Sequence, residues 1–100
     1  MTIAPSYEAV CFHSQQCVEK LMKAVLIDRG LAAPRTHDLL ALAGMVTAAI
    51  PTWTWPTMEL STLTAAAVGF RYPGDSVERE DADEMLDICT RIRASLLALL

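Results

Sequence analysis

The sequence predicts an all-α fold: an antiparallel up-and-down bundle of about four helices, in a single domain spanning residues 1–100. Apolar residues recur at helical spacing along most of the chain, and no stretch alternates apolar and polar residues as a half-buried strand does. Glycine and proline interrupt the pattern at a few points and leave short connections. Helices joined by short connections pack as antiparallel neighbours.

The first predicted helix runs from Ser6 to about Arg29, with apolar positions every three or four residues. Ser6 is a suitable N-cap, because its hydroxyl can accept a hydrogen bond from an unpaired backbone N–H. Gly30 is expected to end the helix, since glycine readily adopts the left-handed conformation that closes many helices.

The second predicted helix follows a short linker and ends near Ile50, before a proline. Thr36 is its expected N-cap. Asp38 is then expected in the first turn, where negative charge interacts favourably with the helix dipole.

The segment PTWTWPT is expected to be a loop, in which Trp53 and Trp55 cover one end of the bundle. Stacking on nucleobases is the alternative role for these rings. A third helix is predicted from Met58 to about Arg71, and the residues YPGD then break the chain.

The last predicted helix begins with Asp75 and Glu78, which resemble a capping box, and reaches Leu100. Residues 72–100 hold seven acidic and three basic residues, which accounts for the formal net charge of −4. This charge argues against a sequence-neutral nucleic-acid binder, which normally has a basic surface. A local anion site in the first 71 residues remains compatible with it.

Cys11, Cys17 and Cys89 do not form the pattern of a disulfide framework, so buried and reduced thiols are expected. His13 and Cys17 lie one helical turn apart, but two further ligands at suitable spacing are missing. We therefore predict no metal site and no cofactor. The apolar runs are too short to span a bilayer and the first residues do not resemble a signal peptide, so a cytoplasmic protein is expected.

One side of the first predicted helix carries an unusual set of polar residues. Four of them fall within roughly 80° of one another on a helix of 3.6 residues per turn: His13, Gln16, Lys20 and Lys23. A solvated face accounts for the lysines, but histidine and glutamine are less favoured as surface residues. An anion-binding groove and a seam between subunits are the alternatives.

Two further clusters contain arginine. In PRTHDL, Arg35 and His37 stand at a predicted helix start, where backbone N–H groups can bind an anion. In RYPGD, Arg71 and Tyr72 could hold a nucleotide through a charged fork and a stacking ring. Ordinary helix-end residues are the simpler interpretation of both clusters.

In their order along the chain, the segments FHSQQCVEKLMKAVLIDRG, PRTHDLLAL and LTAAAVGFRYPGD resemble the HEPN family. These helical domains are named for higher eukaryotes and prokaryotes nucleotide-binding proteins. The resemblance covers roughly residues 7 to 95. It implies a helical bundle that usually dimerises. It also implies a prokaryotic gene commonly adjacent to a minimal nucleotidyltransferase, as in toxin–antitoxin-like pairs.

Some members of this family are metal-independent ribonucleases that use an arginine followed four to six residues later by a histidine. That motif is absent here: the spacing from Arg29 to His37 is too long, and that from Arg35 is too short. No histidine follows Arg71. Ribonuclease activity is therefore not transferred to this chain, and we lean against an enzyme.

Members of the family usually have a complete helix before the FHSQQ helix, whereas only MTIAPSY precedes it here. The chain is then either a shortened form or one whose start lies upstream of this sequence. A bundle without that helix exposes an apolar groove. The mean hydropathy of +0.32 fits a chain that covers such a groove with another subunit, so we expect a homodimer.

Three functions remain open. The first is a module that binds a nucleotide or an RNA-related anion, together with a nucleotidyltransferase partner. The second is a structural dimerisation partner without a ligand, and the third, disfavoured, is a metal-independent ribonuclease. The expected ligand-binding residues are His13, Gln16, Lys20, Lys23, Arg35, His37, Arg71 and Tyr72.

Overall fold

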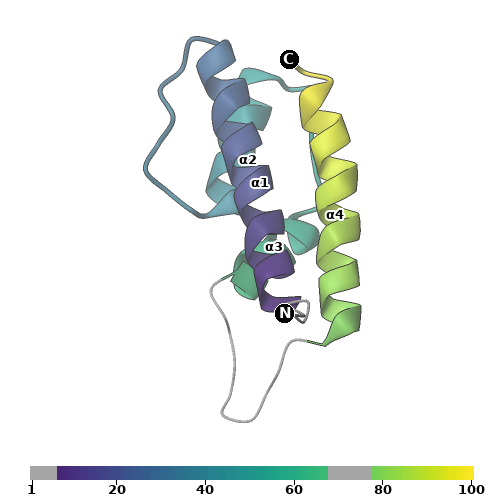
Figure 1. Ribbon diagram of the computed structural model, residues 1–100. Coiled ribbons are helices and arrows are strands. Elements are labelled where there is room, and N and C mark those ends of the chain that lie inside the picture. The colour runs from purple at the N-terminus through teal and green to yellow at the C-terminus, as the bar shows by residue number, and fades with distance from the viewer. Residues whose placement is uncertain (1–6, 68–77) are drawn as a thin grey trace.

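The computed structural model describes residues 7–67 and 78–100, which form four α-helices and no β-strand (Figure 1). The prediction of an all-α fold is confirmed. Within these two ranges, no helix is both long and apolar enough to cross a membrane. The helices are α1 (Tyr7–Asp28), α2 (Leu39–Ala49), α3 (Thr57–Ala67) and α4 (Arg79–Leu97).

The end of α1 is the glycine stop that the sequence predicts. Gly30 has a φ of +80°, a left-handed conformation that favours glycine. Its N–H donates to the Ile27 carbonyl at 2.9 Å, and the Leu31 N–H donates to the Leu26 carbonyl at 2.9 Å. These two bonds form a Schellman motif, which satisfies carbonyls at the end of the helix.

The start of α2 differs from the prediction, because Asp38 and not Thr36 is the N-cap. Asp38 Oδ1 accepts a hydrogen bond from the Leu40 N–H at 3.0 Å, and the helix begins at Leu39. Thr36 Oγ1 instead accepts from the Asp38 N–H at 3.1 Å. The threonine therefore shapes the preceding turn, and the aspartate satisfies the first N–H groups of the helix.

Substitution Asp38→Ala is expected to cost about 0.5–2 kcal/mol of unfolding free energy, because it leaves an N–H at the start of α2 without its cap. Thr36→Ala should cost less than this, since its bond lies outside the helix. Urea unfolding followed by circular dichroism compares the two variants. A larger loss for Thr36→Ala would contradict the assignment of the cap.

Three predictions about helix ends fall on residues outside the described ranges: Ser6 as the first N-cap, the end of the third helix at Arg71, and the role of Asp75 in a capping box. Within the described residues, α4 begins directly after Glu78. The Glu78 N–H donates to Asp81 Oδ2 at 3.0 Å, so the capping interaction lies at these two residues.

The helices do not simply alternate in direction. Arg29, just after α1, donates a hydrogen bond from Nη2 to the carbonyl of Leu99, just after α4, at 3.2 Å, so the two helices end side by side. Figure 1 shows α1 and α4 running the same way. The predicted antiparallel arrangement therefore does not hold for α1 and α4, which run in the same direction. Residues 29–38 return along α1 before α2 begins, so α2 also runs with α1 (Figure 1).

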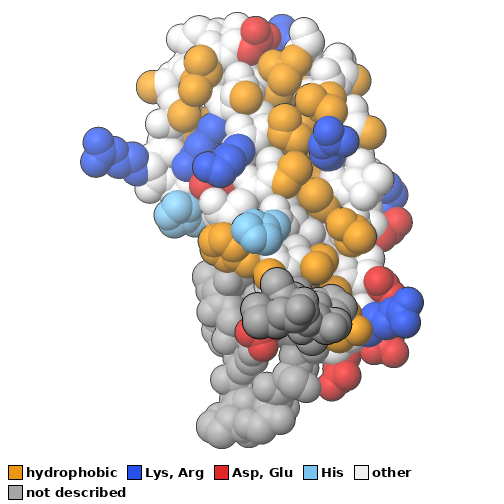
Figure 2. All heavy atoms as spheres, viewed as in Figure 1, with side chains coloured by type: hydrophobic (Ala, Val, Ile, Leu, Met, Phe, Trp, Pro, Cys, Tyr) orange, Lys and Arg blue, Asp and Glu red, His pale blue; other side chains and the backbone are white. Residues whose placement is uncertain are grey.

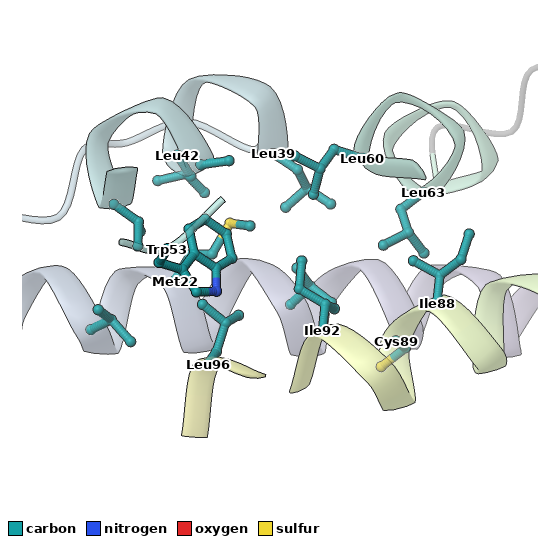
Figure 3. Packing of buried hydrophobic residues seen from close by; sticks show 14 of the residues in the cluster. Met22, Leu39, Leu42, Trp53, Leu60, Leu63, Ile88, Cys89, Ile92 and Leu96 are labelled. Carbon is teal, nitrogen blue, oxygen red and sulfur yellow. The ribbon is translucent and has the colours of Figure 1, made fainter. Parts of the chain in front are cut away.

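All four helices contribute to one apolar core, and α1 packs against each of the other three. Met22 of α1 is fully buried in this core. Figure 3 shows side chains of α2, α3 and α4 pointing toward α1 from their own sides, together with Trp53. Because α1 contacts all three other helices, its apolar face is buried in the core. The exposed polar residues of α1 lie on its other side.

Candidate functional site

A buried glutamate lies between α1 and the segment that leads into α2. Glu19 is only 4% exposed, and Gln15, one helical turn earlier, is 2% exposed. Glutamate is almost never fully buried unless it is paired. The polar partners of these two side chains therefore define the first candidate site.

Three side chains hydrogen-bond to the Glu19 carboxylate. His37 Nδ1 lies 2.9 Å from Oε1, and Gln15 Nε2 donates to the same oxygen at 3.1 Å. Lys23 Nζ donates to Oε2 at 3.2 Å. The carboxylate thus exchanges its water shell for three protein partners, as a buried charge requires.

Gln15 joins α1 to the connection between α1 and α2. Its Nε2 also donates to the backbone carbonyl of His37 at 3.0 Å, across 22 residues of sequence. Its Oε1 accepts a hydrogen bond from Gln16 Nε2 at 2.8 Å. His37 is therefore held at two points, its ring by Glu19 and its carbonyl by Gln15. We call Gln15, Glu19, Lys23 and His37 the Glu19 cluster.

Burial raises the pKa of the Glu19 carboxyl, but the hydrogen bonds from His37, Gln15 and Lys23 and the charge of Lys23 outweigh it. The pKa of Glu19 therefore lies below its ordinary value of 4.5. The group is a carboxylate at neutral pH and can only accept, so the proton of this contact belongs to His37 Nδ1. The His37 side chain is 81% exposed, which leaves its outer edge accessible to a ligand.

Both histidines lie on one face of the molecule. Figure 2 shows side chains of lysine or arginine close to them on this face. Gln16, Lys23 and His37 are brought together by the contacts with Gln15 and Glu19.

The other predicted residues are less tightly held. The His13 ring packs edge-on against Phe12, with ring centroids 5.5 Å apart. Lys20 and Arg35 are exposed, and no hydrogen bond fixes either side chain within residues 7–67 and 78–100. Arg71 and Tyr72 lie outside the described residues.

Gln15 and Glu19 were not among the residues that the sequence pattern indicated. The pattern did contain a signal, because Gln15, Glu19 and Lys23 follow one another at steps of four residues. Such steps place side chains in contact on a helix. Their position beside the apolar residues Val18 and Met22 also indicates burial. Nothing local connects them to His37, which comes close only through the path of residues 29–38.

The two tryptophans serve the fold. Trp53 is 5% exposed, and its Nε1 donates to Ser95 Oγ of α4 at 2.7 Å. Trp55 stacks beside it with centroids 6.5 Å apart and donates from Nε1 to Glu59 Oε1 at 2.9 Å. Arg91 of α4 binds both carboxylate oxygens of Glu59, at 3.1 and 2.9 Å. Trp53 is thus not accessible for stacking on a nucleobase.

The cysteines are thiols, two of them buried and Cys17 half-buried. Burial and the neighbouring Cys17 raise the pKa of the Cys89 thiol to about 11, so Cys89 is protonated and a weak nucleophile at neutral pH. In the part of the chain that the structure describes, no three His, Cys, Asp or Glu side chains are grouped to hold a metal ion.

Comparison with protein families gives a match over almost the whole chain. The family model described as HEPN domain matches residues 3–99. Comparison with curated proteins gives no match, and neither does comparison with solved structures.

Proposed function

The chain belongs to the HEPN domain family, and from this premise we propose that it binds a nucleotide or an RNA-related anion on the face that carries the Glu19 cluster. At family level the domain is a nucleotide- or RNA-related module. The observation that carries the proposal is the buried Glu19 carboxylate, which holds Lys23 and the exposed His37 ring in place. Side chains that are held before binding lose less conformational entropy when a ligand arrives.

The remaining charge on this face favours an anion. Glu19 offsets one positive charge. Lys20, next to Glu19 in the sequence, and Arg35, two residues before His37, are exposed and have no acidic partner among the described residues. His13 and Gln16 add a donor each on the same side of α1. Arg71 and Tyr72 remain part of the proposed site by the sequence pattern alone.

Titration with ATP tests the proposal, by calorimetry at low and at high salt. Lys20→Ala and Arg35→Ala are each expected to weaken binding about tenfold, because each removes a charge-assisted contact to phosphate. Added salt should weaken binding as well, since exposed charges are screened. The matched control is Arg79→Ala, an exposed arginine on α4 beside Asp83, which should leave the affinity unchanged. Absence of heat and of a thermal shift with ATP would refute the proposal.

The proposed setting of this module is a cytoplasmic homodimer that works with a minimal nucleotidyltransferase in a toxin–antitoxin-like pair. The alternative is a structural dimerisation partner, in which the contacts of Glu19 and Gln15 would serve only to fasten the connection between α1 and α2. Wild-type affinity for ATP separates the two, since the structural role requires none.

A further inference from the structure

The outer face of α2 has an unusual composition. None of the 11 residues of α2 is charged, and its exposed positions are all apolar or glycine: Leu40, Ala41, Gly44, Ala48 and Ala49. A surface helix normally carries charged or polar residues on the side away from the core, and a helix that is apolar all round is normally buried.

A shallow pocket opens beside this face, between α2, α3 and the segment that joins them. Its volume is about 410 Å³, and its walls include Gly44 of α2, Leu60 of α3 and the Trp55 ring. No charged side chain lines the pocket, and Leu40 stands at its edge with 38% of its surface exposed. The pocket therefore suits an uncharged, apolar group.

The packing of the fold does not explain why a glycine lines the pocket at position 44. Glycine inside a helix lowers helix stability relative to alanine. A Cβ built on Gly44 would meet nothing within 4 Å, so no neighbouring side chain demands its small size. At this lining position the backbone of α2 has no side chain in front of it.

An exposed apolar side chain lies next to the pocket along the chain. Met58 follows the pocket residue Thr57 at the start of α3 and is 80% exposed. Methionine is flexible and fills irregular gaps. One chain thus offers both an uncharged hollow large enough to admit a methionine side chain and an exposed methionine beside it.

We propose that a second copy of this chain docks on the α2–α3 face, so that Met58 of each copy enters the Gly44 pocket of the other. A contact about a two-fold axis must be complementary to itself, which this pairing of pocket and side chain satisfies. Charge supports the choice of a second copy. The chain has a net charge of −4, but α2 has no charged residue, and Glu59, the one acidic residue of α3, is already paired with Arg91 of the same chain. Two copies can therefore meet on this face without opposing unpaired like charges. The inference rests on the proposed homodimer and assigns its interface.

Sedimentation velocity across micromolar concentrations tests this interface with two variants. Met58→Glu should raise the dissociation constant of the dimer about 100-fold, because it would place an unpaired charge in the apolar pocket. Gly44→Phe should also dissociate the dimer by filling the pocket. Met58→Glu should keep the circular dichroism spectrum and the melting temperature of the wild type, because Met58 is mostly exposed. This variant therefore tests the interface even if Gly44→Phe does not fold.

The matched control is Leu86→Glu, which introduces the same charge at a 52% exposed leucine of α4 and should change the dissociation constant by less than about twofold. A wild-type dimer that survives Met58→Glu would overturn the interface, and so would dissociation by Leu86→Glu alone. A wild-type chain that is monomeric throughout would overturn both interface and homodimer. ATP titration of the same samples reports on the anion site separately, because no residue of that site is changed.

Discussion

Replacement of Trp53 by alanine is expected to lower the free energy of unfolding by about 3–5 kcal/mol. The indole is 5% exposed and packs with Leu42 and Leu96 in the apolar core, so its removal leaves a large cavity (Figure 3). The substitution also leaves Ser95 Oγ without the N–H that now lies 2.7 Å away. Because small domains are stable by only about 5–15 kcal/mol, this single change would remove a large share of the total.

Urea unfolding followed by circular dichroism measures this loss, and Trp53→Phe separates its two causes. Phenylalanine retains most of the apolar contact but lacks the N–H, so its cost should be nearer about 1–2 kcal/mol. Equal costs for the alanine and phenylalanine variants would contradict a dominant role for packing.

Glu19→Gln is expected to lower the free energy of unfolding by about 1–3 kcal/mol at neutral pH. The amide has nearly the volume of the carboxylate but has only one acceptor oxygen. Its NH₂ group would therefore face a donor, either Lys23 Nζ or the pair of His37 Nδ1 and Gln15 Nε2. A buried donor left without an acceptor bears the full cost of its lost hydration.

The cost of Glu19→Gln should depend on pH. The pKa of Glu19 in the folded chain lies below its ordinary value of 4.5, so the folded state binds this proton less readily than the unfolded state does. The stabilisation is therefore fully present above pH 4.5 and is lost as the pH falls through the folded pKa. Unfolding free energies of both proteins, measured between about pH 7 and pH 3, should converge toward the acidic end.

The exposed Glu84 of α4 provides the matched control for this experiment. Glu84→Gln should change the unfolding free energy by less than about 0.5 kcal/mol at every pH. A difference between wild type and Glu19→Gln that grows as the pH falls would mean that the Glu19 carboxylate does not stabilise the fold.

Local sequence features predicted the helices well because their causes are local. The apolar repeat of α1, the left-handed Gly30 and the loop around the tryptophans depend on a few neighbouring residues. The N-cap of α2 was misplaced by two residues, because Thr36 and Asp38 are both good caps and only the backbone path distinguishes them.

The members of the Glu19 cluster were indicated by the sequence only in part. The steps of three and four residues along α1 indicated Lys23, and the sequence PRTHDL indicated His37. Glu19, which joins Lys23 to His37, was missed because a charged residue on a helix is normally expected in water.

The sequence by itself determined the all-α class, the helical segments and the membership of the HEPN domain family, because all three depend on residue patterns along the chain. Only the tertiary structure decided that α2 runs in the direction of α1. This path brings His37 to the buried Glu19. The physical reason is that helical periodicity shows which face of a helix is buried but not which distant segment covers it.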